Sequence, residues 1–516
     1  MADGEMLTFD GLIRHWTREK PGQVALEQDG KALTFAALDE RSRRIVAIQK
    51  AQGLAKGDRV AWLGKNARLY FELFYSAARM GVVMVPIGWR LAAPEIAYIL
   101  GDTGAKLLFI DEGFAGLAAG ACGDMENPPK VIDTPTAKSD IAAAPADDFE
   151  GAGPDDAVLQ LYTSGTTGNP KGAVLTNANL FALRQPAEEA AQPWSSWDED
   201  EAILVCMPCA HIGGTGLGIM AMAAGVRAIV QAEFTPDGVL DGFEQGITRL
   251  FIVPAALQMV VQHPRAKDTD MSAVKYVMYG AAPIPLDLLR EAVQTIPEAG
   301  FLQCYGMTET TGTIAMLPPE DHTLEGNQRM KSAGKAVPGA ELRVVDEDGE
   351  ELPRGEVGEL ICRSPSNMQG YWNLPDATRG ALKDAWMHTG DAAYMDDDGY
   401  VYIQDRIKDM IISGGENVYP AQVESAIYGH PAVGEVAVIG VPDDIWGEAV
   451  KACVVPRPGS EVDPDDIIAF TRERLAGFKV PKTVDVIEAM PRNASGKILR
   501  RELRAPYWKD HDRQVN

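Results

Sequence analysis

The sequence predicts an α/β protein with a large amino-terminal domain of stacked α/β subdomains, a small β-rich subdomain, and a small α+β carboxy-terminal domain. Its 516 residues are too many for one ordinary hydrophobic core and enough for two or more domains. Over the first four hundred residues, apolar strand patterns alternate with amphipathic helix patterns. Near residue 339 the pattern changes to short strands, and near residue 408 to a compact mixture of helices and strands.

The amino-terminal part shows a repeated strand-then-helix order. Residues 58–64 predict a strand that runs into a turn, residues 70–80 an apolar-periodic helix, and residues 81–87 the next buried strand. Further apolar strands are expected at 106–110, 202–205 and 249–253. This order is typical of parallel sheets flanked by helices. Residues 125–154, rich in Ala, Pro and Asp, predict a surface connection.

The carboxy-terminal part shows a different pattern of predicted secondary structure. Short strands separated by Asp-Gly and Gly-Glu turns are expected at 341–346, 358–362 and 400–403. They indicate a β-rich subdomain at about residues 339–405. Pro420 then begins a helix, two antiparallel strands follow at 435–439 and 448–454, and a second helix has Asp463 as its N-cap and Pro464 at its first position. The expected domain ranges are 1–407 and 408–516.

The net charge of the chain argues against some classes of binding partner. The chain carries 48 basic and 74 acidic residues, a formal net charge of −26. This excess argues against nucleic acid as the main partner and against a polybasic membrane anchor, because both are bound through clustered Lys and Arg. No stretch approaches 18 uninterrupted apolar residues, so no membrane-spanning helix is expected. Peripheral membrane association and a homodimer both stay open.

The six cysteines are too few for a disulfide scaffold and indicate a reducing, cytoplasmic location. Neither a secretory signal at the amino terminus nor a Ser-Lys-Leu address at the other end opposes this expectation. Cys206 and Cys209 form a Cys-x-x-Cys pair, which is either a redox or zinc half-site or two small apolar residues at a strand end. The sequence has no second pair at zinc spacing and no thioredoxin-like surroundings, which favours simple packing.

A Gly- and Thr-rich loop is the most informative stretch of the chain. A strand pattern ends at Thr163, a loop with one Lys follows, and a helix begins near Thr176. Glycines let backbone N–H groups approach phosphate oxygens, and hydroxyls and a Lys add donors. The loop differs from a Walker A motif, because Pro170 precedes the Lys. The candidate nucleotide-binding residues here are Thr163, Ser164, Gly165, Thr166, Thr167, Gly168 and Lys171.

This loop resembles the phosphate loop of the adenylate-forming superfamily, which contains acyl-CoA synthetases, amino-acid adenylation domains and luciferases. Four further stretches resemble that family's motifs in the family's order: 303–309 for adenine and magnesium, 386–391 for ribose, 405–409 for the hinge, and 491–497 for the carboxy-terminal catalytic loop. The resemblance covers residues 10 to 505, nearly the whole chain, and favours the acyl-CoA synthetase branch.

The resemblance implies an ATP-dependent acid–CoA ligase that forms acyl-CoA, AMP and pyrophosphate through an acyl-adenylate. Its expected partners are a small carboxylic acid, ATP, Mg²⁺ and coenzyme A. Adenylation joins two anions, so catalysis is mainly positioning and charge neutralisation. Glu309 is the expected magnesium ligand, with Thr166 as a second one. Thr308 is expected to donate its hydroxyl to the α-phosphate and Tyr305 to stack on adenine.

Other nucleotide contacts follow from the same resemblance. Asp391 is expected to accept from both ribose hydroxyls, and Arg406 to reach the same end. Lys497 is expected to bridge the substrate carboxylate and the α-phosphate, which lowers their repulsion during attack. The remaining expected nucleotide contacts are Gly280, Ala281, Ala282, Gly306 and Met307.

The family uses its carboxy-terminal domain in two orientations, so the resemblance implies that this small α+β domain is mobile. Lys408 occupies the hinge position, where a residue must absorb the change in φ and ψ. One orientation supplies Lys497, and the other brings a second face of the domain to the pantetheine tunnel. The residues expected to approach coenzyme A are Ser413, Gly414, Gly415, Glu416 and Trp446. For Trp446 a purely structural role is an equal alternative.

The acid-binding pocket is predicted around His211, which could orient the carboxylate, gate the pocket, or simply be a packed polar residue at a strand end. The other candidate pocket residues are Gly213, Gly214, Tyr279, Gly280, Cys304, Gly306 and Met307. Family members commonly have Gly where Cys304 and Ala281 stand, so both positions add volume to the wall. Gly216 and Gly218, with Gly213 and Gly214, could leave a long tunnel. A medium- or long-chain fatty acid is favoured over an aryl or arylpropenoyl acid, because no polar pair to recognise a phenol is evident.

Three rival functions are weaker. Amino-acid adenylation usually needs an Asp near His211 to hold the ammonium group, and none is present. No feature favours a luciferase-type oxygenase. A non-catalytic nucleotide sensor on the same fold is opposed by the intact Glu309, Asp391 and Lys497.

Overall fold

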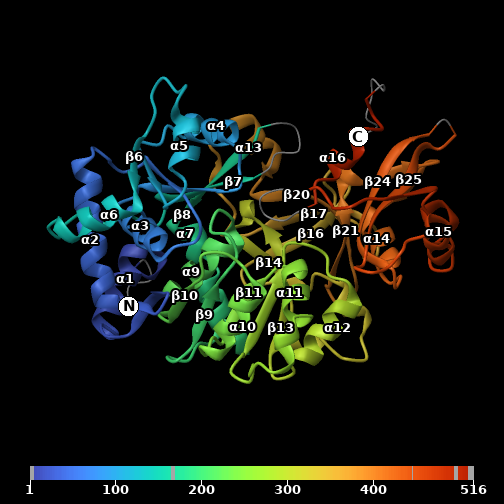
Figure 1. The fold of residues 1–516 in the computed structure, drawn as a ribbon, viewed down its shortest axis with the longest axis horizontal. Coiled ribbons are helices and arrows are strands. Elements are labelled where there is room, and N and C mark those ends of the chain that lie inside the picture. Colours follow the sequence, from blue (N-terminus) through green and yellow to red (C-terminus); the bar gives the residue numbers. More distant parts are fainter. Residues whose placement is uncertain (1–4, 164–168, 444, 493–497, 510–516) are drawn as a thin grey trace.

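The computed structural model describes residues 5–163, 169–443, 445–492 and 498–509. Within these residues the strands form four sheets, which we call A to D, of nine, seven, five and five strands. Figure 1 shows sheets A and B with their helices in one large lobe, and sheet D in a smaller lobe beside it. This is the α/β architecture with a small α+β carboxy-terminal domain that the sequence predicts.

Sheets A and B form the body of the large lobe. Sheet A has the order β15-β14-β13-β12-β11-β9-β10-β1-β2, and sheet B the order β18-β8-β7-β4-β3-β5-β6. The strands of sheet A are β1 Val24–Gln28, β2 Lys31–Thr34, β9 Ala202–Val205, β10 Arg227–Val230, β11 Arg249–Ile252, β12 Tyr276–Gly280, β13 Gly300–Met307, β14 Gly312–Leu317 and β15 Lys335–Ala336. Those of sheet B are β3 Arg59–Leu63, β4 Val83–Ile87, β5 Leu107–Ile110, β6 Lys130–Asp133, β7 Ala157–Thr163, β8 Lys171–Thr176 and β18 Gly370–Tyr371.

The two remaining sheets are antiparallel apart from one edge pair. Sheet C contains β16 Glu341–Val345, β17 Gly358–Arg363, β19 Leu382–Lys383, β20 Trp386–Met395 and β21 Val401–Arg406. Sheet D contains β22 Ile411–Ser413, β23 Glu416–Val418, β24 Val433–Asp443, β25 Gly447–Pro456 and β26 Thr483–Val486, of which β26 runs parallel to β25. The chain therefore passes from sheet C to sheet D between Arg406 and Ile411.

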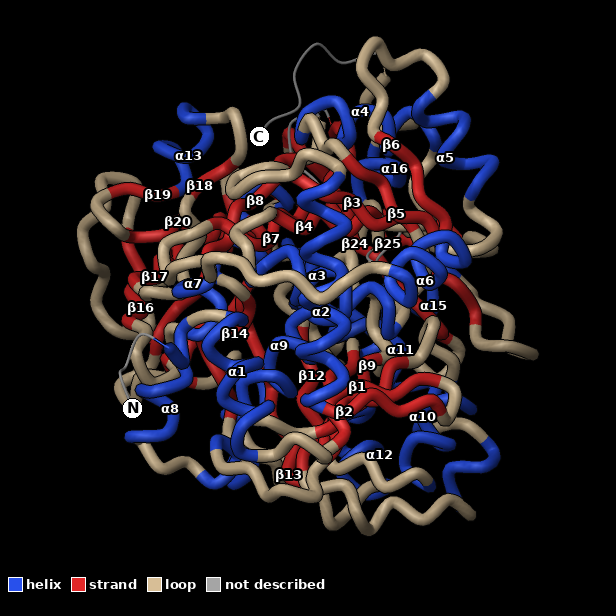
Figure 2. The backbone as a smooth tube through the Cα atoms, turned by 90° about the vertical axis from the view of Figure 1, so that its left-hand side faces the viewer, coloured by secondary structure: helices blue, strands red, loops and turns tan. Residues whose placement is uncertain are grey.

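The helices cover the sheets and lie between A and B, as Figure 2 shows for α3 and α9. They are α1 Phe9–Glu19, α2 Phe35–Ala51, α3 Arg68–Arg79, α4 Ala93–Thr103, α5 Ala115–Cys122, α6 Thr134–Ala143, α7 Asn177–Phe181, α8 Arg184–Glu189, α9 Ile212–Ala224, α10 Pro236–Glu244, α11 Pro254–Val261, α12 Leu286–Thr295, α13 Pro375–Ala381, α14 Pro420–Tyr428, α15 Pro464–Arg472 and α16 Arg500–Arg504. In the part of the chain that is described, none of them is long and apolar enough to cross a membrane.

Most predicted elements lie within a few residues of their expected positions. The strand expected at 202–205 is β9, and the strands expected at 58–64 and 249–253 are β3 and β11. Helix α14 begins at Pro420. Helix α15 has Pro464 at its first position, and the side chain of its N-cap Asp463 accepts a hydrogen bond from the backbone of Asp465.

Two local predictions were wrong. Residues 125–154 are more than a surface connection, because they contain β6, which pairs with β5 at the edge of sheet B, and helix α6. The overlooked signal is Asp133 before Thr134 and Pro135, since the Asp133 side chain caps the helix and Pro fits its first turn. Strand β8, which follows the Gly- and Thr-rich loop, was missed, whereas the helix expected near Thr176 is confirmed as α7, with Thr176 as its N-cap.

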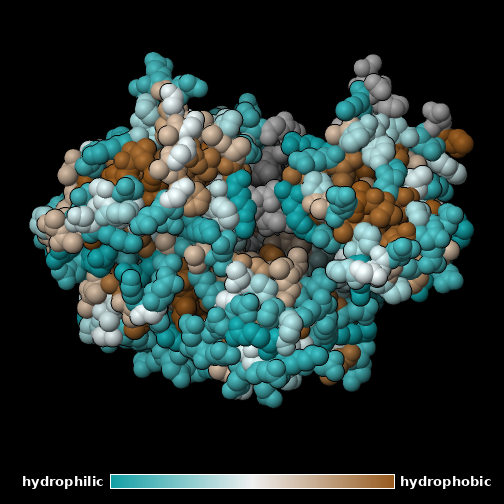
Figure 3. Space-filling view, viewed as in Figure 1, coloured by the Kyte–Doolittle hydropathy of each residue, from teal (hydrophilic) through white to brown (hydrophobic). Residues whose placement is uncertain are grey.

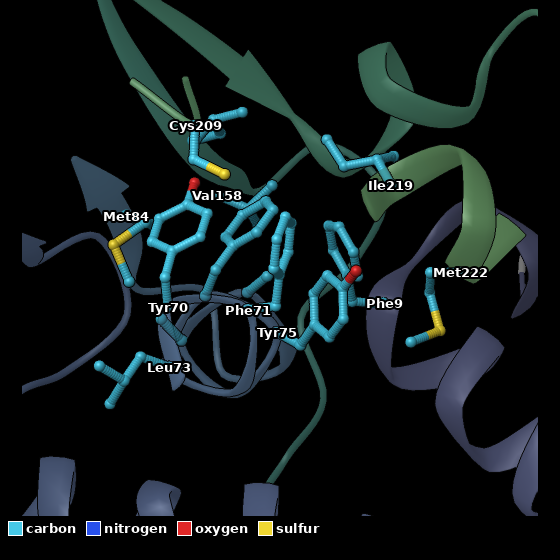
Figure 4. Close-up of a cluster of buried hydrophobic side chains, with 14 of the residues drawn as sticks. Phe9, Tyr70, Phe71, Leu73, Tyr75, Met84, Val158, Cys209, Ile219 and Met222 are labelled. Atoms are coloured by element: carbon cyan, nitrogen blue, oxygen red, sulfur yellow. The ribbon is translucent and has the colours of Figure 1, made fainter. Parts of the chain in front are cut away.

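An aromatic cluster joins the two large sheets through their helices. Figure 4 shows Tyr70, Phe71 and Tyr75 of α3 directed toward α9 and toward Phe9 of α1. The Tyr70 hydroxyl lies 2.7 Å from the Thr215 hydroxyl, and the Tyr75 hydroxyl donates to the Gly218 carbonyl at 2.7 Å. Because these buried hydroxyls are satisfied by α9, the helix is held firmly, and its other face is positioned for the site described next.

Candidate active site

A large cleft lies between the two lobes. It has a volume of about 3030 Å³ and is lined by residues of sheets A, B and C and of the carboxy-terminal domain. Figure 3 shows this hollow between the lobes. The carboxyl ends of β12 and β13 open onto it with Gly280 and Tyr305, and β20 and β21 contribute Asp391 and Arg406. Ligands of parallel sheets commonly bind at such ends.

The strands on either side of the predicted phosphate loop, β7 and β8, pair antiparallel at this cleft. Thr163 at the end of β7 pairs with Lys171 at the start of β8, and both line the cleft. The ammonium of Lys171 lies 5.1 Å from the centre of the Tyr371 ring. The predicted residues Ser164, Gly165, Thr166, Thr167 and Gly168 lie outside the described part of the chain.

Glu309 stands at the centre of a small hydroxyl cage. Its carboxylate is only 5% exposed and follows β13 in the 3-10 helix Thr308–Thr310. The Tyr371 hydroxyl donates to Oε1 at 2.8 Å, and the Thr163 hydroxyl donates to the same oxygen at 3.2 Å. Within the described residues, this arrangement leaves Oε2 available to a metal ion. Burial and the nearby Glu309 raise the pKa of Tyr371, so its hydroxyl stays a donor.

Sequence reasoning missed Tyr371. It is 62 residues from Glu309 along the chain and reaches the site because the short strand β18 pairs with β8 at the edge of sheet B. In that pairing Tyr371 stands opposite Ala173, two residues after Lys171. A two-residue strand has no recognisable periodicity, so the sequence carried no local signal for it.

The predicted ribose residues form a compact charged cluster. Asp391 of β20 pairs in register with Arg406 of β21, whose Nε lies 2.8 Å from Asp391 Oδ1. The Tyr305 hydroxyl donates to Asp391 Oδ2 at 2.5 Å, and Arg406 also donates to the Thr389 carbonyl at 2.9 Å. Burial, the largest single effect, opposes the Arg406 charge, but the acidic groups around it, Asp391 foremost, together outweigh burial and raise the pKa of Arg406. The Asp391 carboxylate is thus oriented by two side chains that donate to it.

Two glycines allow the backbone walls of the cleft to approach closely. A Cβ at Gly280 would lie 2.0 Å from the Cys304 carbonyl oxygen, and one at Gly306 would lie 1.8 Å from the Gly312 carbonyl oxygen. Both positions therefore require glycine. Ala281 and Thr311 beside them adopt left-handed backbone conformations, with φ of 65° and 58°. Such conformations are strained for these residue types and cluster at functional sites.

His211 is placed where the sequence predicts, at the edge of the cleft. It is the N-cap residue of α9 with φ of −124°, and it lines the cleft with Gly213 and Gly214. Burial lowers the pKa of His211, so the imidazole is neutral near pH 7 and has an N–H to offer to an oxygen.

Tyr279 does not line the acyl pocket, contrary to the prediction. It is fully buried on the opposite face of β12, where its hydroxyl lies 2.9 Å from His322 Nε2 and 3.3 Å from Gln303 Oε1. Strand residues alternate between faces, so the neighbours Met278 and Gly280 face the cleft instead. Cys304, Gly306 and Met307 line the cleft as expected.

The glycines of α9 have different surroundings, so they do not together form the long tunnel that the sequence suggested. A Cβ at Gly214 would lie 2.3 Å from the Pro208 carbonyl oxygen, and one at Gly213 would lie 3.0 Å from the Phe251 ring. A Cβ at Gly218 would lie 2.1 Å from the Phe71 ring, inside the aromatic cluster. Only at Gly216, among these four, is the nearest atom 3.8 Å away, on Ile212.

Alanine at Gly218 is expected to lower the midpoint of thermal unfolding, because the added methyl group collides with Phe71. Overpacking of this kind costs about 1–3 kcal/mol. Gly216→Ala is the matched control, since it lies on the same helix and gains the same helix propensity in open space. We expect Gly216→Ala to keep or raise the unfolding midpoint and to slow activation of bulky acids. Equal midpoints for the two variants in calorimetry would contradict this account.

A partly buried charge cluster joins the two lobes. Arg500 of α16 donates to both carboxylate oxygens of Glu424 at 2.8 Å and lies 4.0 Å from Asp405 and 3.9 Å from Asp409. Asp405 in turn accepts at 2.8 Å from the backbone N–H of Ala421 in α14. Burial raises the pKa of Asp405 to about 6, with Glu424 adding to the effect and Arg500 opposing it.

The predicted hinge and catalytic lysines can be placed only through their neighbours. Lys408 is in the 3-10 helix Ile407–Asp409 between sheets C and D, and its side chain lies outside the described part of the structure. Lys497 is also outside the described residues. Arg492 and Ile498, on either side of the undescribed segment 493–497, both line the cleft that contains Asp391.

The predicted coenzyme A residues lie together beside the cleft, without lining it. Gly414 and Gly415 adopt φ of 62° and 83°, and the Gly414 N–H donates to the Trp446 carbonyl at 2.8 Å. A Cβ at Gly414 would lie 2.7 Å from the Trp446 ring, which is 43% exposed. Of the described cleft-lining residues, Ile412 and Asn417 flank this turn, whereas Ser413, Glu416 and Trp446 are not among them.

Cys206 and Cys209 are buried free thiols that pack beside the site. Burial raises the pKa of Cys206 to about 12 and also raises that of Cys209, so neither is a thiolate near neutral pH. Their surroundings are those of packed side chains, as the sequence favoured. Cys209 contributes a backbone N–H, which donates to Asn66 at 2.8 Å.

Comparisons with known proteins agree with this geometry. A family model of AMP-binding enzymes matches residues 13–372, and one of the AMP-binding enzyme C-terminal domain matches residues 422–497. The fatty acid–[acyl-carrier-protein] ligase ScoC of Streptomyces coeruleorubidus is 40% identical over 514 residues, covering 97% of this chain and 96% of that protein. A feruloyl-CoA synthase of Amycolatopsis is 39% identical over 495 residues, covering 94% and 96%. ATP-bound MatB from Rhodopseudomonas palustris superposes with a TM-score of 0.87 at 32% identity, covering 98% of this chain and 99% of that one.

The fold and the site define an adenylate-forming enzyme. The chain belongs to the AMP-binding enzyme family, and within the adenylate-forming superfamily it falls in the acyl-CoA synthetase branch. ATP with Mg²⁺ and coenzyme A as co-substrate fit a member of this branch.

Proposed function

We propose that the protein is an AMP-forming acid–CoA ligase that activates a carboxylic acid with ATP and transfers the acyl group to coenzyme A. The observation that carries this proposal is the arrangement of Glu309 and Asp391 in one cleft. Each carboxylate is held by a tyrosine hydroxyl, from Tyr371 and Tyr305 respectively. Two fixed carboxylates suit a nucleotide with its metal ion at one end and its ribose at the other.

The residues present fit a magnesium ion. Mg²⁺ prefers oxygen ligands and often takes one carboxylate, several waters and substrate phosphates. Glu309, which is 5% exposed and accepts two hydroxyl hydrogen bonds, is a suitable single carboxylate. Thr163 and Lys171, paired on β7 and β8 beside it, would bind the phosphates. The metal would neutralise phosphate charge, and Glu309 would hold it, joined by Thr166 of the phosphate loop.

The chain's own groups then lower the barrier by position and charge. Asp391 binds the ribose hydroxyls, and Arg406 holds that carboxylate in place. The backbone walls at Gly280 and Gly306 hold the adenine, with Thr308 at the α-phosphate. Neutral His211 donates its N–H to the substrate carboxylate without adding a charge. Lys497 reduces the repulsion between that carboxylate and the α-phosphate as they approach.

The acid we favour is a medium- or long-chain fatty acid. The part of the cleft below His211 is lined by apolar and sulfur-containing side chains, among them Leu217, Met220, Phe251, Met278 and Cys304. Methionines adapt to flexible chains. This choice agrees with the relative ScoC, a ligase of fatty acids.

An aryl or arylpropenoyl acid is the second candidate. Phe251 and Tyr276 place aromatic rings along the same wall, and rings of this kind stack on planar substrates. The relative from Amycolatopsis is a feruloyl-CoA synthase. The two candidates differ in the shape of the acid, so they can be separated by a substrate panel.

The test is pyrophosphate release with straight-chain and aryl acids, each with and without coenzyme A. We expect pyrophosphate with at least one acid class and an acyl-CoA product when coenzyme A is present. If pyrophosphate is released but no acyl-CoA forms, the acceptor is a group other than coenzyme A, such as the pantetheine of a carrier protein. Binding of ATP with no pyrophosphate from any acid would overturn the proposal in favour of a nucleotide sensor.

A further inference from the structure

The depth of the acyl pocket can be derived from the residues of β12 that line it, from Gly280 to Tyr276. On β12, Gly280, Met278 and Tyr276 line the cleft, whereas the alternate residues Val277 and Tyr279 lie in the core on the other face. Strands rise about 3.3 Å per residue, so Tyr276 lies about 13 Å below Gly280 at the nucleotide end. Helix α9 covers this face and runs the opposite way, from His211 at the nucleotide end to Ala224 at the far end.

Arg249 stands at the far end of this pocket. It begins β11 and pairs in register with Tyr276 of β12, which in turn pairs with Gly300 of β13. A Cβ at Gly300 would lie 2.9 Å from the Tyr276 ring, so that ring lies across the neighbouring strand. Counting the lining residues of β12 from the nucleotide end, Tyr276 is the third, after Gly280 and Met278. At this depth the pocket therefore meets the Tyr276 ring and the Arg249 guanidinium.

The Arg249 guanidinium clamps a segment that crosses this end. Nη1 donates to the Trp194 carbonyl at 2.6 Å, and Nη2 donates to the Ser196 carbonyl at 2.5 Å. The same group lies 3.7 Å from the centre of the Trp197 ring and 4.8 Å from that of Tyr276. Trp194 and Trp197 pack against the same core cluster as Ala223 and Ala224 at the end of α9. The two tryptophans and this end of α9 thus line the same cleft.

A buried carboxylate fixes the guanidinium in turn. Arg249 Nε donates to Glu201 Oε2 at 2.5 Å and Nη2 to Oε1 at 3.1 Å, and the two side chains are 4% and 2% exposed. Glu201 also accepts from Lys275 at 3.2 Å and from Thr248 at 3.2 Å. Because Nε, Nη1 and Nη2 all donate hydrogen bonds within the protein, Arg249 has a structural role and does not bind a second carboxylate on the substrate.

We propose that Arg249 is a positioning residue that holds Trp194 and Trp197 as the far wall of the acyl pocket, and that this wall limits the length of the acid. This inference rests on the proposed acid–CoA ligase function and deepens it. The substrate class that fits is a monocarboxylic acid with an uncharged apolar tail that ends about 13 Å from the nucleotide end. A dicarboxylic acid would leave its second charge unpaired against the two tryptophans.

The test compares chain-length profiles of pyrophosphate release for wild type, Trp197→Ala, Trp197→Leu and Arg249→Lys. Trp197→Leu keeps an apolar side chain if the alanine variant folds poorly. Arg249→Lys keeps the charge but loses the planar fork. Arg265→Lys is the matched control, because the Arg265 guanidinium is also held by acidic side chains, Asp237 at 2.7 Å and Asp241 at 2.8 Å, but on the exposed surface.

We expect the Trp197 and Arg249 variants to shift the preferred acid toward longer chains. Their kcat/KM ratio of longer to shorter acids should rise roughly fourfold for each further methylene that becomes buried. The control should keep the wild-type profile. Variants that are active but change kcat/KM by one factor for all chain lengths would overturn this inference alone. Wild-type protein that releases no pyrophosphate with any acid would overturn the proposed function, and this inference with it.

Discussion

Replacing Lys497 with alanine is expected to reduce acid-dependent pyrophosphate release by roughly 10²–10³-fold, the effect of removing one preorganised donor from a developing charge. The segment 493–497 is bounded by Arg492 and Ile498, which both line the cleft of Asp391. Thioester formation from supplied acyl-adenylate and coenzyme A should stay near the wild-type rate, because we expect that step to take place in a second orientation of the domain, without Lys497. Rapid-quench measurement of the two half-reactions separates these effects.

Lys509→Ala is the control for this experiment, because Lys509 is an exposed lysine of the same domain. It should leave both half-reactions unchanged. If Lys497→Ala slows both half-reactions by the same factor, one arrangement of the lobes serves both steps, and the prediction of two orientations is wrong.

Replacing Glu309 with glutamine is expected to lower kcat/KM for ATP by about 10²-fold or more and to raise the Mg²⁺ concentration needed for half-maximal rate. The amide keeps the shape of the side chain but removes the charge that a metal ion needs. It also leaves the hydroxyls of Tyr371 and Thr163 beside a neutral group. Titration of the rate with Mg²⁺ at saturating acid measures the change.

Tyr371→Phe provides a graded companion to Glu309→Gln. It removes one hydrogen bond to Glu309 and keeps the ring under Lys171, so we expect a loss of about tenfold in the same direction. Rates that fall equally in both variants at every Mg²⁺ concentration, with no change in the half-maximal concentration, would refute the assignment of Glu309 as metal ligand.

The sequence predicted the fold class and those site residues that belong to continuous motifs. Apolar strand patterns located β3, β9 and β11, and cap signals located the start of α15. Glu309, Asp391, Arg406 and His211 all line the cleft where the motifs placed them. Short-range patterns are enough for these features, because each depends on residues adjacent in the chain.

Features that depend on pairing between distant segments were not predicted. Whether β12 directs Tyr279 or Met278 toward the cleft depends on which face α9 covers, and a shift of one residue reverses it. Tyr371 reaches Glu309 only through pairing of β18 with β8. Arg249 looked like the first residue of a buried strand, and its clamp on Trp194 and Trp197 spans more than fifty residues.

Because β18 pairs with β8, nucleotide binding also depends on the association of sheets A and B. Thr163 and Tyr371 belong to sheet B, whereas Glu309 follows β13 of sheet A, so their cage forms only when the two sheets have come together. A ligand that binds only the assembled form stabilises it by about 2.7 kcal/mol at a hundredfold excess over its dissociation constant. Magnesium and ATP should therefore delay proteolytic cleavage in both sheets at once, which makes protease resistance a measure of cooperativity between the two halves of the large lobe.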